Sequence, residues 1–335
     1  MKRIISLLLA LALTLSLTAC TAPAEKADDG KLQIVTTLFP YYDFARAIAQ
    51  DRADVTLLLS PGREAHSFEP TPLDAVTISE ADVFLYNGGE GEYWVDSMLD
   101  AAGENIAVIA RMMDYVDALD EEYVEGMQGA DGHDHDHEHG SHDDHDHDHE
   151  EDEHDSDEIE YDEHIWTSPK NAVVLCRAVC DAICRADAEN AAFYRANCEN
   201  YCAQLEDLDA RFAALCESAP RRLLIFADRF PMLYFCREYG LDYRAAFHGC
   251  SGDTEPSLAT IKFLIDKVED ENIPVVYTID FGTKKVAAVV SECTGAAIET
   301  LYSMQTVSRA DFDAGETYLT LMERNFEALR KGLNA

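Results

Sequence analysis

Basic residues are scarce in this chain of 335 residues. It contains 26 lysines and arginines against 65 aspartates and glutamates, which gives a formal net charge of -39. Residues 131–163 carry 18 of the acidic side chains and neither lysine nor arginine. A chain without a basic patch is not expected to bind nucleic acid. The acidic composition suits a cationic partner, although it also keeps a protein soluble.

The sequence motifs of hydrolytic enzymes are also missing. The chain contains no H-E-x-x-H motif, and no serine or cysteine nucleophile motif stands out. A catalytic zinc usually keeps three protein ligands, an open position for water and a nearby general base. We therefore do not expect an enzyme.

The C-x-x-C spacing of many zinc clusters is absent as well. Nine cysteines remain besides Cys20, and five of them recur at intervals of four residues: Cys176, Cys180, Cys184, Cys198 and Cys202. This interval puts each set on one face of a helix. We interpret them as small buried apolar side chains. A disulfide between the two helices is the alternative in an exported protein, but its pairing cannot be deduced from the sequence.

The N-terminus has the pattern of an export signal. Two basic residues precede a mainly apolar run over residues 4–17, which is too short for a comfortable transmembrane helix. Residues 1–19 are interpreted as a signal peptide. Leu17-Thr18-Ala19-Cys20 resembles the bacterial lipobox, and this resemblance implies cleavage before Cys20 and a lipid on its sulfur. Residues 20–30 would then be a polar tether, which places the protein outside the cytoplasmic membrane, anchored by lipid.

Strand-like and helix-like segments alternate along the remainder. We predict strands at residues 32–37, 54–59, 82–86 and 106–110, and again at 222–227, 242–247, 274–279 and 296–301. Helical segments separate them, which predicts an α/β fold of two lobes, each with a four-stranded, mainly parallel sheet and flanking helices. The lobes span residues 31–167 and 220–335. The connection, residues 168–219, contains a helix of nearly 30 residues that would span about 45 Å at ~1.5 Å per residue.

Residues 133–154 form a run of alternating acidic residues and histidines. It has almost no apolar side chains, so it cannot bury enough surface to fold, and we predict a disordered loop over residues 131–160. Segments rich in histidine and acid are typical of metal collection. The candidate collecting residues are His133, His135, His137, His139, His142, His145, His147, His149 and His154.

Four further side chains occupy equivalent places at predicted strand ends. His66 lies in the loop after the second strand, and His164 ends the insertion after the fourth. In the second half, Asp228 follows the first strand and Asp280 the third. Ligands of open α/β sheets bind at the carboxyl ends of strands, and imidazole with carboxylate suits zinc and also manganese. Asp228 is alternatively a helix cap and Asp280 a turn residue.

Three motifs resemble the zinc- and manganese-binding lipoproteins of metal ABC importers, and the likeness covers nearly the whole chain after Gly30. The motifs lie at residues 63–70, 162–171 and 318–325. The resemblance implies two lobes bridged by one rigid helix, with the metal between them and His66 and His164 as ligands. It also implies a third ligand after the first strand of the second lobe, where Asp228 is the nearest candidate, and a fourth at Asp280. His248, after the next strand, is the alternative third ligand.

We therefore expect a solute-binding lipoprotein that captures Zn(II) and delivers it to the permease of an ABC importer. An acidic histidine-rich loop before the second ligand histidine is typical of the zinc-binding members of this family. The alternatives are a member that binds Mn(II) and a metal-buffering or adhesion lipoprotein. We expect a monomer that contacts the membrane through its lipid.

Overall fold

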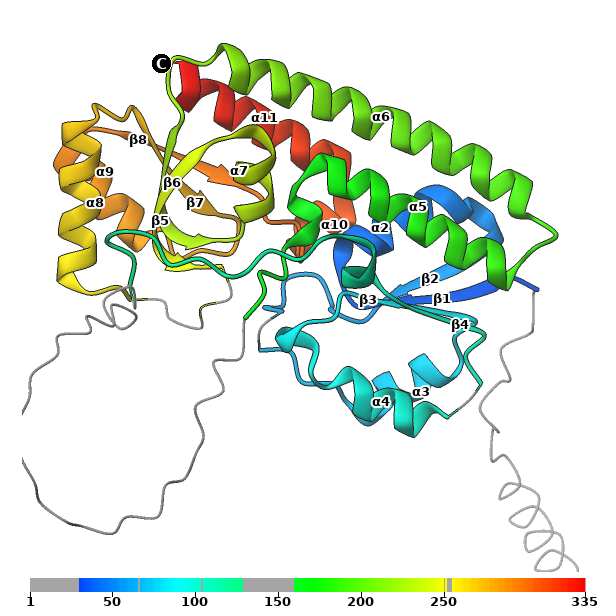
Figure 1. Cartoon of the computed structure of the whole chain (residues 1–335). Helices are drawn as coiled ribbons and strands as arrows, with labels where there is room; N and C mark the ends of the chain where they lie inside the picture. The colour runs from blue at the N-terminus through cyan, green and yellow to red at the C-terminus, as the bar shows by residue number, and fades with distance from the viewer. Residues whose placement is uncertain are drawn as a thin grey trace, which may run out of the picture. The chain divides into compact units, whose positions relative to one another are not determined.

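The computed structural model describes residues 30–65, 67–103, 105–128, 160–249, 251 and 255–334 (Figure 1). They form two four-stranded sheets with the strand orders β2-β1-β3-β4 and β6-β5-β7-β8. Every strand pair is parallel. The predicted fold class is thereby confirmed, because parallel strands need helical crossovers and the sequence supplies a helix between successive strands.

The first sheet contains β1 (Leu32–Thr36), β2 (Ala53–Leu57), β3 (Val83–Tyr86) and β4 (Val108–Arg111). Its helices are α2 (Phe39–Ala49), α3 (Pro72–Ser79) and α4 (Val95–Ala102). Thr71 and Asp74 form a capping box at the start of α3, and Pro72 occupies the first turn, where its missing N–H costs nothing. The central strands β1 and β3 are mostly buried, as expected for a parallel sheet covered on its faces, whereas the edge strands β2 and β4 include exposed residues.

The second sheet contains β5 (Leu223–Phe230), β6 (Asp242–His248), β7 (Val275–Ile279) and β8 (Ala297–Leu301). Its helices are α7 (Leu233–Tyr239), α8 (Leu258–Asp270), α9 (Lys285–Thr294), α10 (Arg309–Ala314) and α11 (Tyr318–Asn334). The strand β5 continues three residues beyond the predicted end at Ala227. The register with β6 shifts between Phe226 and Arg229, so an irregularity lets the strand extend past the expected stop.

Helices α5 (Pro169–Ala186) and α6 (Ala191–Ser218) connect the two halves. Ser168 caps α5 through its side chain and Pro169 follows at the first helical position. Asn190 is the N-cap residue of α6. Helix α6 has 28 residues and packs on α2 and α5 at one end and on α7 and α11 at the other (Figure 1). It therefore bridges the two halves.

One hydrophobic core joins the two sheets and the helices between them. Phe84 of the first sheet and Phe226 of the second belong to the same buried cluster. A buried carboxylate reinforces this junction: Asp43 of α2 accepts hydrogen bonds from the Tyr201 hydroxyl of α6 at 2.5 Å and from the Tyr318 N–H of α11 at 3.0 Å. A smaller cluster lies under α8 and α9.

Residues 119–121 and 160–162 form an antiparallel pair that we call the stem. The Glu121 N–H donates to the Glu160 carbonyl at 2.8 Å, and the Asp162 N–H donates to the Leu119 carbonyl at 2.9 Å. Beyond the stem, the Gln128 N–H donates to the Ala246 carbonyl of β6 at 3.0 Å. The chain on both sides of the histidine-rich run is thus fixed against the second half. Among the helices in the described ranges, none combines the length and apolar character needed to cross a membrane.

Candidate metal centre

A small pocket lies where loops of both halves meet. His164 precedes α5, Asp280 follows β7, and both line this pocket. Two predicted site residues that are more than one hundred positions apart are therefore brought together. The other lining residues are Glu64, Arg229, Pro231, Gly249, Ile279, Phe281, Ser303, Gln305 and Thr306.

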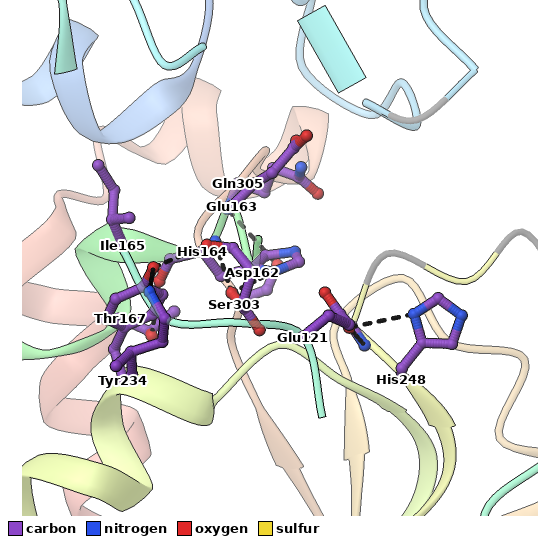
Figure 2. A network of polar contacts seen from close by, with 12 residues as sticks. Glu121, Asp162, Glu163, His164, Ile165, Thr167, Tyr234, His248, Ser303 and Gln305 are labelled. Carbon is purple, nitrogen blue, oxygen red and sulfur yellow. Dashed lines mark hydrogen bonds and ion pairs between the residues drawn. The ribbon is translucent and has the colours of Figure 1, made fainter. Parts of the chain in front are cut away.

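His164 is almost completely buried, at 1% exposure. The Asp162 carboxylate accepts hydrogen bonds from the His164 backbone N–H at 2.7 Å and contacts His164 Nδ1 at 3.1 Å (Figure 2). A carboxylate on Nδ1 orients the ring and makes Nε2 the metal-binding nitrogen in many histidine sites. Trp166 packs edge-on against the ring at 5.6 Å between centroids. Burial alone would lower the pKa of His164, but Asp162, Glu121 and Glu163 raise it above its ordinary value.

A close approach of backbone also holds the His164 ring. A Cβ added at Gly249 would lie 3.1 Å from His164 Cε1 and 2.9 Å from the Phe230 carbonyl oxygen. The loop after β6 therefore packs directly on the imidazole, and a larger residue would displace the ring or the loop. The ring is fixed from two sides, by Asp162 and by this glycine.

Asp280, which follows β7 in the second half, supplies a carboxylate to the pocket. Its Oδ1 accepts a hydrogen bond from the Ser303 N–H at 3.1 Å. Burial raises the pKa of Asp280 to about 6, against the opposing effect of the Ser303 hydrogen bonds. A bound cation would favour the ionised form, so a metal ion would compete with a proton for this carboxyl.

Two residues of the pocket lining form an ion pair. Arg229 of β5 donates from Nη1 to Glu64 Oε1 at 2.9 Å, and its side chain is 11% exposed. A guanidinium is unusual beside a cation site, and Glu64 offsets its charge. The partner of Arg229 therefore comes from the loop after β2.

Asp228 is not among the residues that line this pocket. It lies inside β5, and its Oδ2 accepts a hydrogen bond from the Thr278 hydroxyl at 2.6 Å. A Cβ on Gly282 would lie 1.7 Å from the same oxygen, so the carboxylate is packed tightly against the loop after β7. It makes these contacts instead of capping the following helix.

His248 ends β6 and contacts Glu121 of the stem. Its Nδ1 lies 3.0 Å from Glu121 Oε1, which also accepts a hydrogen bond from the Gly249 N–H at 2.8 Å. Figure 2 shows Glu121 between His248 and the group around His164. Burial would raise the pKa of Glu121, but His248 and His164 lower it. The sequence offered no signal for Glu121, because its partners lie more than 40 positions away.

Glu163 joins the segment that carries His164 to loops of the first half. Its Oε1 accepts a hydrogen bond from the Gly91 N–H at 2.7 Å, and its backbone carbonyl accepts one from Asn87 Nδ2 at 3.0 Å. His66, Cys20 and the nine histidines of the run lie outside the described residues. The structure does place the residue before His66, Ala65, and also Glu64, which lines the pocket.

Comparison with known proteins adds a family to this geometry. The family model described as "Zinc-uptake complex component A periplasmic" matches residues 34–332. The high-affinity zinc uptake system protein ZnuA of Bacillus subtilis is 30% identical over 306 residues, covering 90% of this chain and 88% of that protein. The zinc-binding lipoprotein AdcA of Streptococcus pneumoniae is 31% identical over 332 residues, covering 99% of this chain and 61% of AdcA.

Two solved structures share the fold. The metal-dependent lipoprotein YcdH of Bacillus subtilis superposes with a TM-score of 0.71 at 29% identity, covering 90% of this chain and 100% of that one. The Zn(II)-bound ZnuA-like domain of Streptococcus pneumoniae AdcA superposes with a TM-score of 0.71 at 26% identity, covering 91% of this chain and 100% of that domain.

Proposed function

Because this chain belongs to the family of periplasmic zinc-uptake components, we propose that it binds one Zn(II) ion between its two α/β halves and delivers the ion to the permease of an ABC importer. The observation that carries the proposal is the convergence of His164 and Asp280 from separate halves on one pocket. The zinc-binding names of its relatives support Zn(II) over Mn(II) as the cargo. The protein would bind and release the ion without covalent chemistry.

We assign His66, His164 and Asp280 as the ligands. Imidazole nitrogen and carboxylate oxygen are both ordinary zinc donors. His66 is included because the loop that carries it reaches the pocket at Glu64. Asp228 is retained as a candidate third protein ligand, but its carboxylate would have to leave Thr278, so we expect it to matter less than Asp280. His248 is the alternative, and Glu121 holds it.

Competition titration against a chromophoric zinc chelator tests these assignments. His66→Ala, His164→Ala and Asp280→Ala should each weaken the tight site by orders of magnitude, because each removes a bond to the metal. His248→Ala tests the alternative ligand: if His248 does not bind the metal, the affinity should stay within about tenfold, or ~1.4 kcal/mol. Wild-type affinity in His164→Ala would remove the basis of the proposal. A large loss in His248→Ala would instead make His248 a ligand.

The cargo itself is decided by elemental analysis of protein purified without chelator or added metal. We expect one zinc per chain in the tight site. Manganese in its place would favour the alternative, a family member that binds Mn(II). A metal buffer would show only several weak sites. Growth of a deletion strain in zinc-depleted medium, rescued by the wild type but not by His164→Ala, tests uptake.

We also propose that the mature chain begins at Cys20 and is held at the membrane by lipid on that residue, with residues 20–30 as a tether. The name of the related lipoprotein AdcA supports this. Cys20→Ala should release the protein from the membrane fraction or leave it unprocessed. A Cys20→Ala protein that is cleaved and sediments with membranes like the wild type would contradict the lipid anchor.

A further inference from the structure

Four cysteines converge where α5 packs on α6, apart from the residues that line the zinc pocket. Cys176 and Cys180 lie one turn apart on α5, and Cys198 and Cys202 lie one turn apart on α6. Each is at most 3% exposed. The sulfur atoms of Cys176, Cys198 and Cys202 all lie within 4.8 Å of one another. We call these four residues the thiol cluster.

The fourth thiol touches the same group. Cys180 lies one turn beyond Cys176 on α5, and a hydrogen bond with Cys198 is the leading cause that raises the pKa of its thiol. Cys198 Sγ lies 3.9 Å from Cys202 Sγ. Cys184, one turn further along α5, lies 3.9 Å from Cys180 and donates to the Ala191 carbonyl at 3.7 Å. It is therefore directed toward the end of the helix pair.

The sulfurs of Cys176, Cys198 and Cys202 are close enough to share one metal ion, whereas the Cys180 sulfur is not within 4.8 Å of all three and would have to rotate toward the ion to become the fourth ligand. In a tetrahedral zinc site with Zn–S bonds of about 2.3 Å, neighbouring sulfurs lie roughly 3.8 Å apart. Structural zinc sites also draw pairs of cysteines separated by two to four residues, and the thiol cluster has two pairs separated by three. A disulfide would need sulfurs at about 2.05 Å, and all four of these thiols are free.

The bonds that the thiols make at present are weak. Cys198 donates to the Cys176 carbonyl at 3.8 Å, and Cys202 donates to the Val173 carbonyl at 3.9 Å. Both carbonyls are helical and already accept from their own helix, so losing these contacts costs little. A cation lies nearby, because Arg177 of α5 forms ion pairs with Glu199 and Glu206 of α6.

We propose that the thiol cluster binds one soft divalent cation with a filled d shell, of the Zn(II) and Cd(II) class, through Cys176, Cys180, Cys198 and Cys202. Binding exchanges four S–H bonds for four metal–sulfur bonds and releases four protons. Four protein ligands close the coordination sphere, which is the arrangement of a structural site. The ion clamps α5 to α6 and is distinct from the cargo, because the cluster is buried in both helices and has no route for exchange without opening them.

Cadmium is the probe, because thiolate ligands give it a charge-transfer band in the ultraviolet that imidazole and carboxylate do not. The full-length protein is unfolded in guanidinium with reductant, refolded with Cd(II), and washed with chelator to remove ions from the histidine-rich run. One chelator-resistant cadmium with the thiolate band is expected in the wild type and in His164→Ala, together with a rise in Tm of several degrees. The His164→Ala variant separates this site from the zinc pocket.

Two variants locate the site. Cys198→Ala with Cys202→Ala should abolish the band, whereas Cys216→Ala, which removes another buried thiol of α6, should retain it. A wild-type protein without the band overturns the proposal even if the double variant fails to fold. The proposal also fails if the band survives in the double variant, or if intact mass shows two hydrogens fewer in the native protein, which is the mark of a disulfide.

Discussion

Substitution of Asp162 tests how the protein prepares His164 for a metal ion. A single oxygen, Asp162 Oδ1, contacts both the backbone N–H and Nδ1 of His164. Asp162 is 1% exposed, so no water can readily replace it. Asp162→Asn keeps an oxygen in place and removes the charge. Asp162→Ala removes both, and the comparison separates orientation from electrostatics.

The expected magnitudes follow from these contacts. Loss of a carboxylate behind a ligand histidine typically weakens metal binding by 10- to 100-fold, or about 1.4–2.8 kcal/mol. We expect Asp162→Asn near the lower end, because the amide oxygen can still accept both hydrogen bonds. Asp162→Ala should lie near the upper end, because the imidazole then loses the group that orients it.

The pH dependence gives a second, independent signature. Zinc competes with a proton for the imidazole, and Asp162 is the leading cause that raises the pKa of His164 against the effect of burial. Wild-type affinity should therefore begin to fall, on acidification, at a pH above the free value of ~6.5. In Asp162→Asn the fall should come at lower pH. The ratio of wild-type to variant affinity should shrink as the solution becomes more acidic.

Competition titration at several pH values measures both effects, with Asp114→Asn as the control because that carboxylate is 64% exposed. Denaturant unfolding of the metal-free proteins shows whether a variant is merely unstable. If Asp162→Asn and Asp162→Ala both bind zinc within twofold of the wild type, Asp162 does not position a ligand, and the assignment of His164 loses its main structural support.

Three further outcomes are expected. Burial raises the pKa of Glu92 to about 7, so its protonated form stabilises the fold at low pH, and this stability is lost as the pH rises from about 4.5 to 7. In denaturant unfolding, Glu92→Gln should therefore be more stable than the wild type by up to about 3 kcal/mol at pH 8. The two proteins should be equally stable at pH 4. Gly249→Ala should weaken zinc binding, because the added Cβ would lie 3.1 Å from the His164 ring. Unchanged affinity in competition titration would show that the loop after β6 can move away without disturbing the ring. Deleting residues 131–156 should remove several weak zinc sites in isothermal titration and leave the affinity of the tight site within about tenfold. Binding in an unfolded run is weak because it must order backbone, at a cost of roughly 1–2 kcal/mol per residue. Loss of the tight site on deletion would mean that the run supplies a ligand.

Most of the architecture could be predicted because it depends on local patterns. Parallel strands buried on both faces appear as short apolar runs, and the helices between them begin with recognisable caps such as Ser168-Pro169. The prediction is wrong where a contact between residues far apart in the sequence determines the structure. The strand β5 continues through Phe230 because it pairs with Phe247 and His248 of β6 past an irregularity, and nothing near Ala227 indicates this.

Candidate ligands could be named from the sequence, and two of them, His164 and Asp280, line one pocket, but their surroundings could not be predicted. His164 was identified from the point where the acidic run gives way to apolar residues, and Asp280 from its place after a strand. The pairing of Arg229 with Glu64 and the contact of His248 with Glu121 join residues 165 and 127 positions apart, so they follow only from the folded chain. Asp162, two residues before His164, is the exception: it lies in the quoted motif, and its spacing could have suggested a carboxylate on the ring.

The packing between the halves bears on how a bound ion would leave. Asp43 is buried and joins three helices, and hydrogen bonds to a charged group contribute about 1.5–3 kcal/mol each. Opening the halves would break these bonds and expose the core that both sheets share. The loop after β2 is held more lightly, by the Gly62 N–H on the Val307 carbonyl at 2.7 Å and by the part-exposed pair of Glu64 with Arg229. This loop carries Glu64 and leads directly to His66. Under the proposed function, its displacement by a docked permease would remove the proposed ligand His66 and take the Glu64 charge away from Arg229. We therefore expect release by movement of this loop to cost less than separation of the halves. Glu64→Gln removes the negative charge opposite the guanidinium, so it should weaken zinc binding and speed the loss of zinc to a chelator.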